Sequence, residues 1–90
     1  GEEFIILLPN TTLEGAQHVA ETLCQDIANM NFNINDHNVP VTISLGVANQ
    51  LPNEVNEPEV LIKQADQVLY QAKENGRNQV CCFTEETDNL

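Results

Sequence analysis

The sequence predicts a mixed α/β domain, and three observations support this. Apolar residues in segments 13–30 and 61–72 recur at spacings of three and four, the periodicity of a helix with one buried face. Residues 4–8 form a continuous apolar run closed by Pro9 and Asn10, as is typical of a buried strand. Residues 39–48 are rich in β-branched side chains, which favour another strand.

The first helix is predicted to begin after Thr11 and to end near Asn31. Thr11 as the cap, followed by Glu14 three residues later, has the pattern of a capping box. The buried stripe of this helix is expected to consist of Leu13, Ala16, Ala20, Leu23, Ile27 and Met30.

A short strand is predicted over residues 32–34, where polar and apolar side chains alternate briefly. Residues 35–38 are dense in turn formers, so this strand should turn into the long strand 39–48. Gly46 inside the long strand indicates a bulge or a close backbone approach. Residues 49–57, with Pro52, are predicted to be a surface loop rather than a linker between domains.

The second helix carries start and stop signals. Asn56 with Glu59 forms a second capping signal, Pro58 suits a first helical turn, and Gly76 is placed to end the helix as its C′ residue. A final strand is expected over residues 79–83 and a flexible acidic tail over 84–90. The apolar stripe of this helix should be Leu61, Ile62, Ala65, Val68, Leu69 and Ala72.

Composition excludes several classes of function. Fourteen acidic residues against three basic ones give a formal net charge of −11, which argues against a surface for nucleic acid or anionic membrane. There is no apolar run long enough to suggest a membrane span. Cys24, Cys81 and Cys82 form neither a metal-binding pattern nor an even disulfide framework, which predicts a reducing, cytoplasmic setting. The length of 90 residues allows one domain at most.

Two adjacent carboxylates, Glu2 and Glu3, lie between Gly1 and the apolar strand. Magnesium prefers hard oxygen ligands and usually takes one or two protein carboxylates, so a pair at a strand mouth suits that ion. The alternative is that both are ordinary solvated turn residues, because exposed acids are the rule.

Lys73 and Arg77 are two of only three basic residues and stand four apart at the predicted helix end. They could contact an anionic ligand, or they could simply be last-turn cations that complement the helix dipole. His18 and His37 have no partner spacing and are predicted to be surface or satisfied residues.

Three segments in order resemble the GGDEF family, the diguanylate cyclases. Gly1-Glu2-Glu3-Phe4 is similar to the end of the Gly-Gly-Glu-Glu-Phe variant of its motif, residues 41–48 resemble its following strand, and residues 65–78 resemble its C-terminal signature. The resemblance covers residues 1–83 but only the C-terminal half of the family domain. It implies a ferredoxin-like α/β sandwich, similar to polymerase palm domains, with about three main strands, a short hairpin strand and two long helices.

The resemblance implies a role for each site residue. Glu2 would bind Mg²⁺ or Mn²⁺ and help to activate a 3′-hydroxyl, with Glu3 as the supporting catalytic carboxylate. Gly1 would let the backbone approach the nucleotide phosphates, and Lys73 and Arg77 would contact the terminal phosphates of GTP. The family's helix pattern also includes Asp66 and Tyr70, which are expected to serve helix packing and hydrogen bonding.

The implied activity is condensation of two GTP molecules into cyclic di-GMP by a homodimer of the domain. An upstream sensor domain is expected in the parent protein, which would be cytoplasmic or anchored to a membrane through upstream segments.

The sequence begins inside the motif without Met, so we expect a fragment that is inactive alone. The first-strand metal ligand, the guanine-reading residues and any RxxD inhibitory site would precede residue 1. Two alternatives remain open: a degenerate nucleotide-sensing regulatory module and a structural dimerisation domain. Intact Glu2, Glu3, Lys73 and Arg77 argue against degeneracy.

Overall fold

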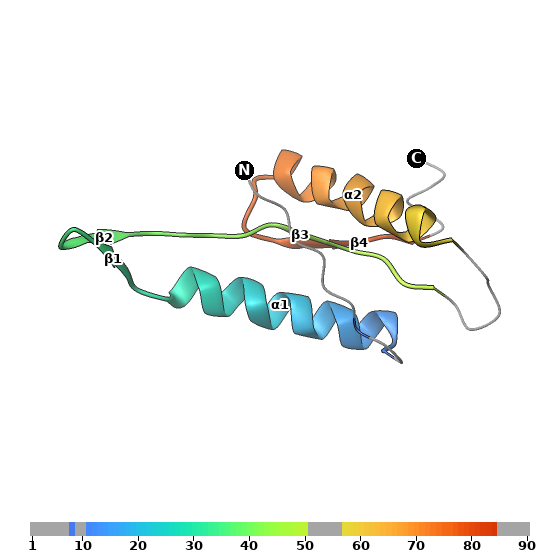
Figure 1. Ribbon diagram of the computed structural model, residues 1–90, viewed down its shortest axis with the longest axis horizontal. Helices are drawn as coiled ribbons and strands as arrows, with labels where there is room; N and C mark the ends of the chain where they lie inside the picture. Colours follow the sequence, from blue (N-terminus) through green and yellow to red (C-terminus); the bar gives the residue numbers. More distant parts are fainter. Residues whose placement is uncertain (1–7, 9–10, 51–56, 85–90) are drawn as a thin grey trace.

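The computed structural model describes residue 8 and residues 11–50 and 57–84. The order of elements is α1 (Leu13–Asn29), β1 (Phe32–Ile34), β2 (His37–Val39), β3 (Leu45–Val47), α2 (Pro58–Glu74) and β4 (Val80–Cys82) (Figure 1). The predicted α/β class and both long helices are confirmed. The strand predicted over residues 4–8 and the tail after Thr84 lie outside the described residues, apart from Leu8.

The centre of the fold is a three-layer sandwich. Strands β3 and β4 pair in parallel, with Gly46 opposite Cys81, and α2 is the crossover between them. Each helix contacts both strands, whereas the two helices do not contact each other, so the strands lie between them (Figure 1). The buried residues of the described chain come from the inner faces of the helices: Ala20 and Cys24 from α1, Val68 and Ala72 from α2.

Gly46 marks the closest approach of β3 to α2. A Cβ atom at this position would lie 2.5 Å from the Leu69 backbone nitrogen and 2.9 Å from its Cα, and would also collide with the Ala65 carbonyl oxygen. The close backbone approach predicted from the sequence is therefore confirmed, and its partner is the second helix.

Helix α1 begins one residue later than predicted. Thr12, not Thr11, is the N-cap, because the Thr12 hydroxyl oxygen accepts a hydrogen bond from the Gly15 amide at 3.0 Å. Glu14 consequently occupies the second helical position. There its negative charge interacts favourably with the positive end of the helix dipole, and it does not close a capping box. The helix ends at Asn29 with Met30 as C-cap, slightly before the predicted Asn31, and Met30 is exposed.

The long strand predicted over residues 39–48 is wrong. It is divided into β2, which pairs with β1 in an antiparallel hairpin, and β3, which pairs with β4. Residues 40–44 belong to neither ladder. Pro40 has no amide hydrogen to donate, and it follows the last residue of the hairpin ladder. The hairpin contacts none of the other described helices and strands, and it projects along the long axis (Figure 1).

Helix α2 starts with Glu57 as N-cap and Pro58 in the first turn. The Asn56 cap proposed from the sequence falls outside the described residues, and the Glu57 side chain makes no capping hydrogen bond. The predicted apolar stripe is confirmed at Val68 and Ala72, which are fully buried, while Ile62 is exposed. Neither described helix is long and apolar enough to cross a membrane.

Candidate active site

The C-terminal end of α2 brings together the two cations singled out in the sequence. Lys73 lies in the last helical turn and is half-buried. After the C-cap Asn75, Gly76 has φ +117°, which a residue with a side chain rarely adopts. Its amide donates to the Lys73 carbonyl at 3.4 Å, and the Arg77 amide donates to the Ala72 carbonyl at 2.9 Å. These two bonds form a Schellman motif, so the prediction that Gly76 ends the helix is confirmed.

Arg77 lies in the loop beyond the helix, which we call the 76–78 loop, and its side chain is exposed. It has φ 63°, and Asn78 follows with φ 53°, so three successive residues are left-handed. Asparagine tolerates this region, whereas the conformation costs an arginine about 1–2 kcal/mol. Because Arg77 is itself a predicted substrate contact, this unfavourable conformation points to a constraint imposed by its surroundings.

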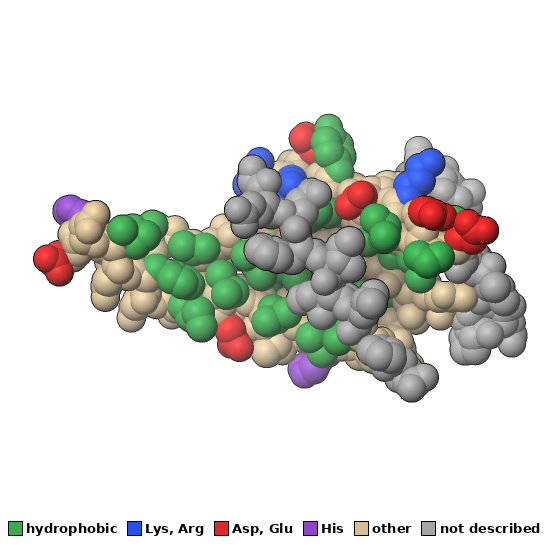
Figure 2. All heavy atoms as spheres, viewed as in Figure 1, with side chains coloured by type: hydrophobic (Ala, Val, Ile, Leu, Met, Phe, Trp, Pro, Cys, Tyr) green, Lys and Arg blue, Asp and Glu red, His purple; other side chains and the backbone are tan. Residues whose placement is uncertain are grey.

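An anion could bind at this end of α2 only with the help of the positive charges of Lys73 and Arg77. A helix C-terminus carries partial negative charge, and its carbonyls here accept hydrogen bonds from the Asn75, Gly76 and Arg77 amides. Unlike a helix N-terminus, it therefore attracts anions only through nearby cations. Figure 2 shows Lys and Arg side chains in blue near both ends of α2, including this one. Lys73 and Arg77 can supply that charge, as a mobile ammonium and as a planar fork.

Gly1, Glu2 and Glu3 lie outside the described residues, so their roles stay predictions. Within the described segments, no group of three His, Cys, Asp or Glu side chains is arranged to hold a metal ion. The carboxylates expected from the sequence to bind the ion are Glu2, with Glu3 in support, at the start of the chain.

Four other residues named from the sequence lie on the surface. His18 and His37 are exposed, as predicted. Asp66 is also exposed, and Tyr70 keeps 65% of its surface accessible. The packing role expected of Asp66 and Tyr70 is wrong among the described residues, because both side chains are exposed, and the expected hydrogen bonding of the two residues stays a prediction.

Several residues that hold the 76–78 loop were not predicted from the sequence. The Asn78 amide donates to Ser44 Oγ at 3.1 Å, and the Gln79 side chain donates to two backbone carbonyls. The buried Cys24 thiol lies 3.6 Å from Asn78 Oδ1 and equally far from the Ile43 carbonyl, so its one hydrogen can serve either acceptor. The sequence did carry one signal for this loop: Gly76 is followed two residues later by Asn78, and both residue types tolerate left-handed backbone.

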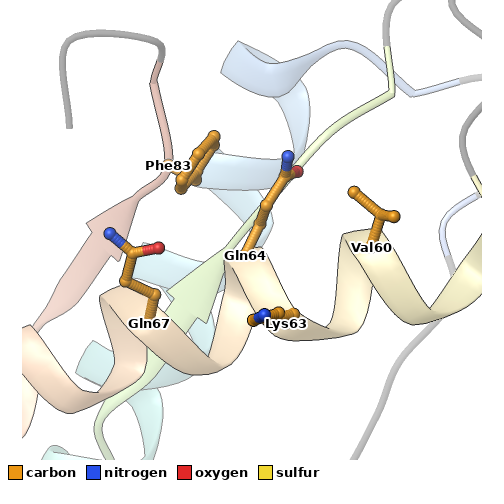
Figure 3. A pocket seen from close by; sticks show the side chains of 5 residues that line it. All are labelled: Val60, Lys63, Gln64, Gln67 and Phe83. Atoms are coloured by element: carbon orange, nitrogen blue, oxygen red, sulfur yellow. The ribbon is translucent and has the colours of Figure 1, made fainter. Parts of the chain in front are cut away.

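Two hollows flank the sheet. One, of about 280 Å³, lies between α1 and the loop and is lined by Glu21, Cys24, Gln25, Asn78, Gln79 and Val80. The other, of about 300 Å³, lies beside the N-terminal half of α2 and is lined by Val60, Lys63, Gln64, Gln67 and Phe83. In Figure 3, Gln64 and Gln67 rise from α2 on the side of Phe83. This second hollow does not include Lys73 or Arg77.

Cys82 is the described residue whose acidity is clearly perturbed. Burial raises the pKa of the Cys82 thiol, and the Glu21 carboxylate and Cys81 push the pKa the same way. A thiol with a raised pKa is a weaker nucleophile near neutral pH than an ordinary cysteine.

The described residues thus form an α/β domain with Lys73 in the last turn of α2 and Arg77 in the loop after it. The family described as "Diguanylate cyclase, GGDEF domain" matches residues 1–79. The chain therefore belongs to the GGDEF family, as the sequence motifs indicated.

Relatives and a solved structure agree with this membership. The chain is 44% identical over 89 residues to the uncharacterized protein YhcK of Bacillus subtilis, covering 98% of this chain and 24% of the relative. It is 39% identical over 82 residues to the response regulator PleD of Caulobacter vibrioides, covering 89% and 18%. A structure of the active GGEEF domain of a diguanylate cyclase from Vibrio cholerae superimposes with a TM-score of 0.72 at 31% identity, covering 87% of this chain and 48% of that one. The chain thus spans at most a quarter of these two relatives and about half of the solved domain.

Proposed function

We propose that this chain is the C-terminal half of a diguanylate cyclase domain, whose parent protein converts two GTP molecules into cyclic di-GMP and pyrophosphate. The observation that carries the proposal is the family match over residues 1–79, which runs from the Glu2–Glu3 pair to the Lys73 and Arg77 end of α2. The domain boundary at residue 83 remains a prediction.

The reaction places distinct demands on these residues. The 3′-hydroxyl of one GTP attacks the α-phosphorus of the other, the bond to the β-phosphate oxygen breaks, and pyrophosphate leaves with the electron pair. A second, equivalent transfer closes the ring. Lys73 and Arg77 hold the terminal phosphates that become the leaving group, and the carboxylates at the start of the chain receive or orient the hydroxyl proton. Gly1 leaves room for the phosphates to approach the backbone.

Magnesium or manganese fits the carboxylate oxygens of Glu2, with Glu3 in support. A bound ion would supply neutralisation of phosphate charge and a lowered pKa of the attacking hydroxyl. The protein's own cations, Lys73 and Arg77, would then stabilise the far end of the triphosphate.

The product defines the assembly. Cyclic di-GMP contains two equivalent halves, so two copies of the domain, each holding one GTP, face each other in a homodimer. The relatives are several times longer than this chain. This leaves room for an upstream sensor domain that controls how the copies meet in the cytoplasm.

The test uses the full-length protein with GTP and magnesium, and cyclic di-GMP is measured by mass spectrometry. We expect product from the wild type, none from Glu2→Ala, and a KM for GTP raised about tenfold or more in Arg77→Ala through loss of a charge-assisted bond. Lys63→Ala, a cation on the same helix outside the candidate site, is the matched control and should behave as wild type. No product from a folded dimer would overturn the proposal and leave a regulatory nucleotide-binding module.

A further inference from the structure

The conformation of the 76–78 loop is one that Arg77 would not adopt unaided. Gly76 and Asn78 suit left-handed backbone, but Arg77 between them does not. The loop also ends the helix and leads directly into β4. Something outside the loop must therefore keep the arginine in place.

Gln79 bridges the two sides of this loop. Its side-chain nitrogen donates to the Asn75 carbonyl and to the Arg77 carbonyl, both at 3.1 Å. A carboxamide NH₂ has two hydrogens, so both are used. Asn75 is the C-cap of α2, which means that one side chain ties the far side of the loop back to the helix end.

Ser44 holds the same loop against the sheet. Its hydroxyl oxygen accepts from the Asn78 amide at 3.1 Å, and the next residue, Leu45, donates its amide to the Gln79 carbonyl at 2.9 Å. These contacts come from a segment more than thirty positions earlier in the chain. Hydrogen bonds thus hold the loop to both the end of α2 and the start of β3.

We propose that Gln79 and Ser44 are positioning residues for Arg77, which lock the loop so that the guanidinium points at the triphosphate of the substrate. The proposal rests on the proposed function. An arginine fork grips phosphate oxygens only in a defined orientation, and ordering it before binding removes that cost from the binding step. Lys73 stands on the helix itself, so the lock acts on Arg77 and not on Lys73.

The test is a double-mutant cycle in the full-length protein, with steady-state kinetics on GTP. Gln79→Ala should raise the KM for GTP about five- to tenfold with a smaller change in kcat, and should add almost nothing in an Arg77→Ala background. Gln79→Glu has the same shape but replaces both donors with acceptors facing carbonyls, so it should be worse than Gln79→Ala. Gln67→Ala and Gln67→Glu, at an exposed position of α2 away from the 76–78 loop, are the matched controls and should leave KM unchanged.

Amide hydrogen exchange of the loop is followed by mass spectrometry in the same variants, because it reports the lock without turnover. Faster exchange in Gln79→Ala and in Ser44→Ala, at an unchanged melting temperature, is expected. Unchanged loop exchange, or effects of Gln79→Ala and Arg77→Ala on KM that multiply, would overturn the proposal. Faster loop exchange in a protein whose wild type makes no cyclic di-GMP would support the lock and count against the proposed function alone.

Discussion

Gly46 is the described glycine at which a side chain would collide most severely with its surroundings. The Gly46→Ala substitution would drive a methyl group into the Leu69 backbone and the Ala65 carbonyl, and neither can move without separating α2 from β3. We expect a loss of about 3 kcal/mol in the free energy of unfolding, the upper end of the usual overpacking range. Urea denaturation of the full-length protein measures it.

The control for that prediction is Gly15→Ala. A Cβ at Gly15 would meet only the side chains of Thr11 and Thr12, at 3.2 and 3.3 Å, and side chains can adjust more readily than backbone. Equal losses for the two variants would show that the contact between β3 and α2 is not what demands a glycine at position 46.

The raised pKa of Cys82 predicts that the stability of the folded protein depends on pH. Its raised pKa means that the folded protein favours the thiol, so the resulting stability is fully present below the pKa of the unfolded chain and is lost as pH rises through the folded pKa. Alkylation by iodoacetamide, followed residue by residue with tandem mass spectrometry, should have its midpoint at higher pH in folded than in urea-unfolded protein. Glu21→Gln should lower that midpoint, whereas Glu14→Gln on the same helix should not. A folded midpoint at or below the unfolded one would contradict the prediction.

At the scale of elements, the hairpin β1–β2 differs from the rest of the fold. Asn35 and Asp36 have φ 52° and 66°, the left-handed pair of a type I′ turn, but the hairpin contacts none of the other described elements. An isolated two-stranded hairpin is marginal in water. We expect amides in residues 32–39 to exchange at least about a hundredfold faster than those around Val68, because the hairpin can open without global unfolding.

Substitution in the turn separates local from global stability. Asp36→Gly removes the steric cost of the left-handed position and should slow exchange in the hairpin while leaving the melting temperature of the full-length protein unchanged. A clear rise in melting temperature would show that the hairpin is coupled to the sandwich.

The elements also show what local patterns can predict. Both helices were predicted because their apolar stripes keep the helical spacing over twelve residues or more, and Gly76 was predicted because few other residues can take its conformation. The cap of α1 was misplaced because two threonines in succession offer the same chemistry, and only the geometry selects Thr12. The division of residues 39–48 was missed because a β-branched run does not say which strand it will pair with.

At the scale of the whole molecule, the described chain has a small core. Its buried apolar residues are Ala20, Cys24, Val68 and Ala72, and larger apolar side chains such as Met30, Ile34 and Tyr70 remain exposed. The solved domain that superimposes on it is about twice as long. We therefore expect the 90-residue chain alone to neither bind GTP tightly nor turn it over, because the proposed site needs the other half of the domain and a second copy.

Isothermal titration of the 90-residue chain with GTP and magnesium tests this, with the full-length protein as the positive control. Binding by the full-length protein alone is the expected result. Micromolar, magnesium-dependent affinity in the short chain would contradict it and would place the whole nucleotide site within these residues.

The sequence by itself determined the α/β class, the two helices, the end of α2 and the family, because periodicity, a left-handed glycine and a motif in fixed order are properties of short segments. Only the tertiary structure decided the partner of Gly46, the separation of β2 from β3 and the bonds from Ser44 and Gln79 that hold Arg77. These depend on contacts between segments far apart in the chain, and such contacts are selected by how the helices and strands pack, not by the residues next to them.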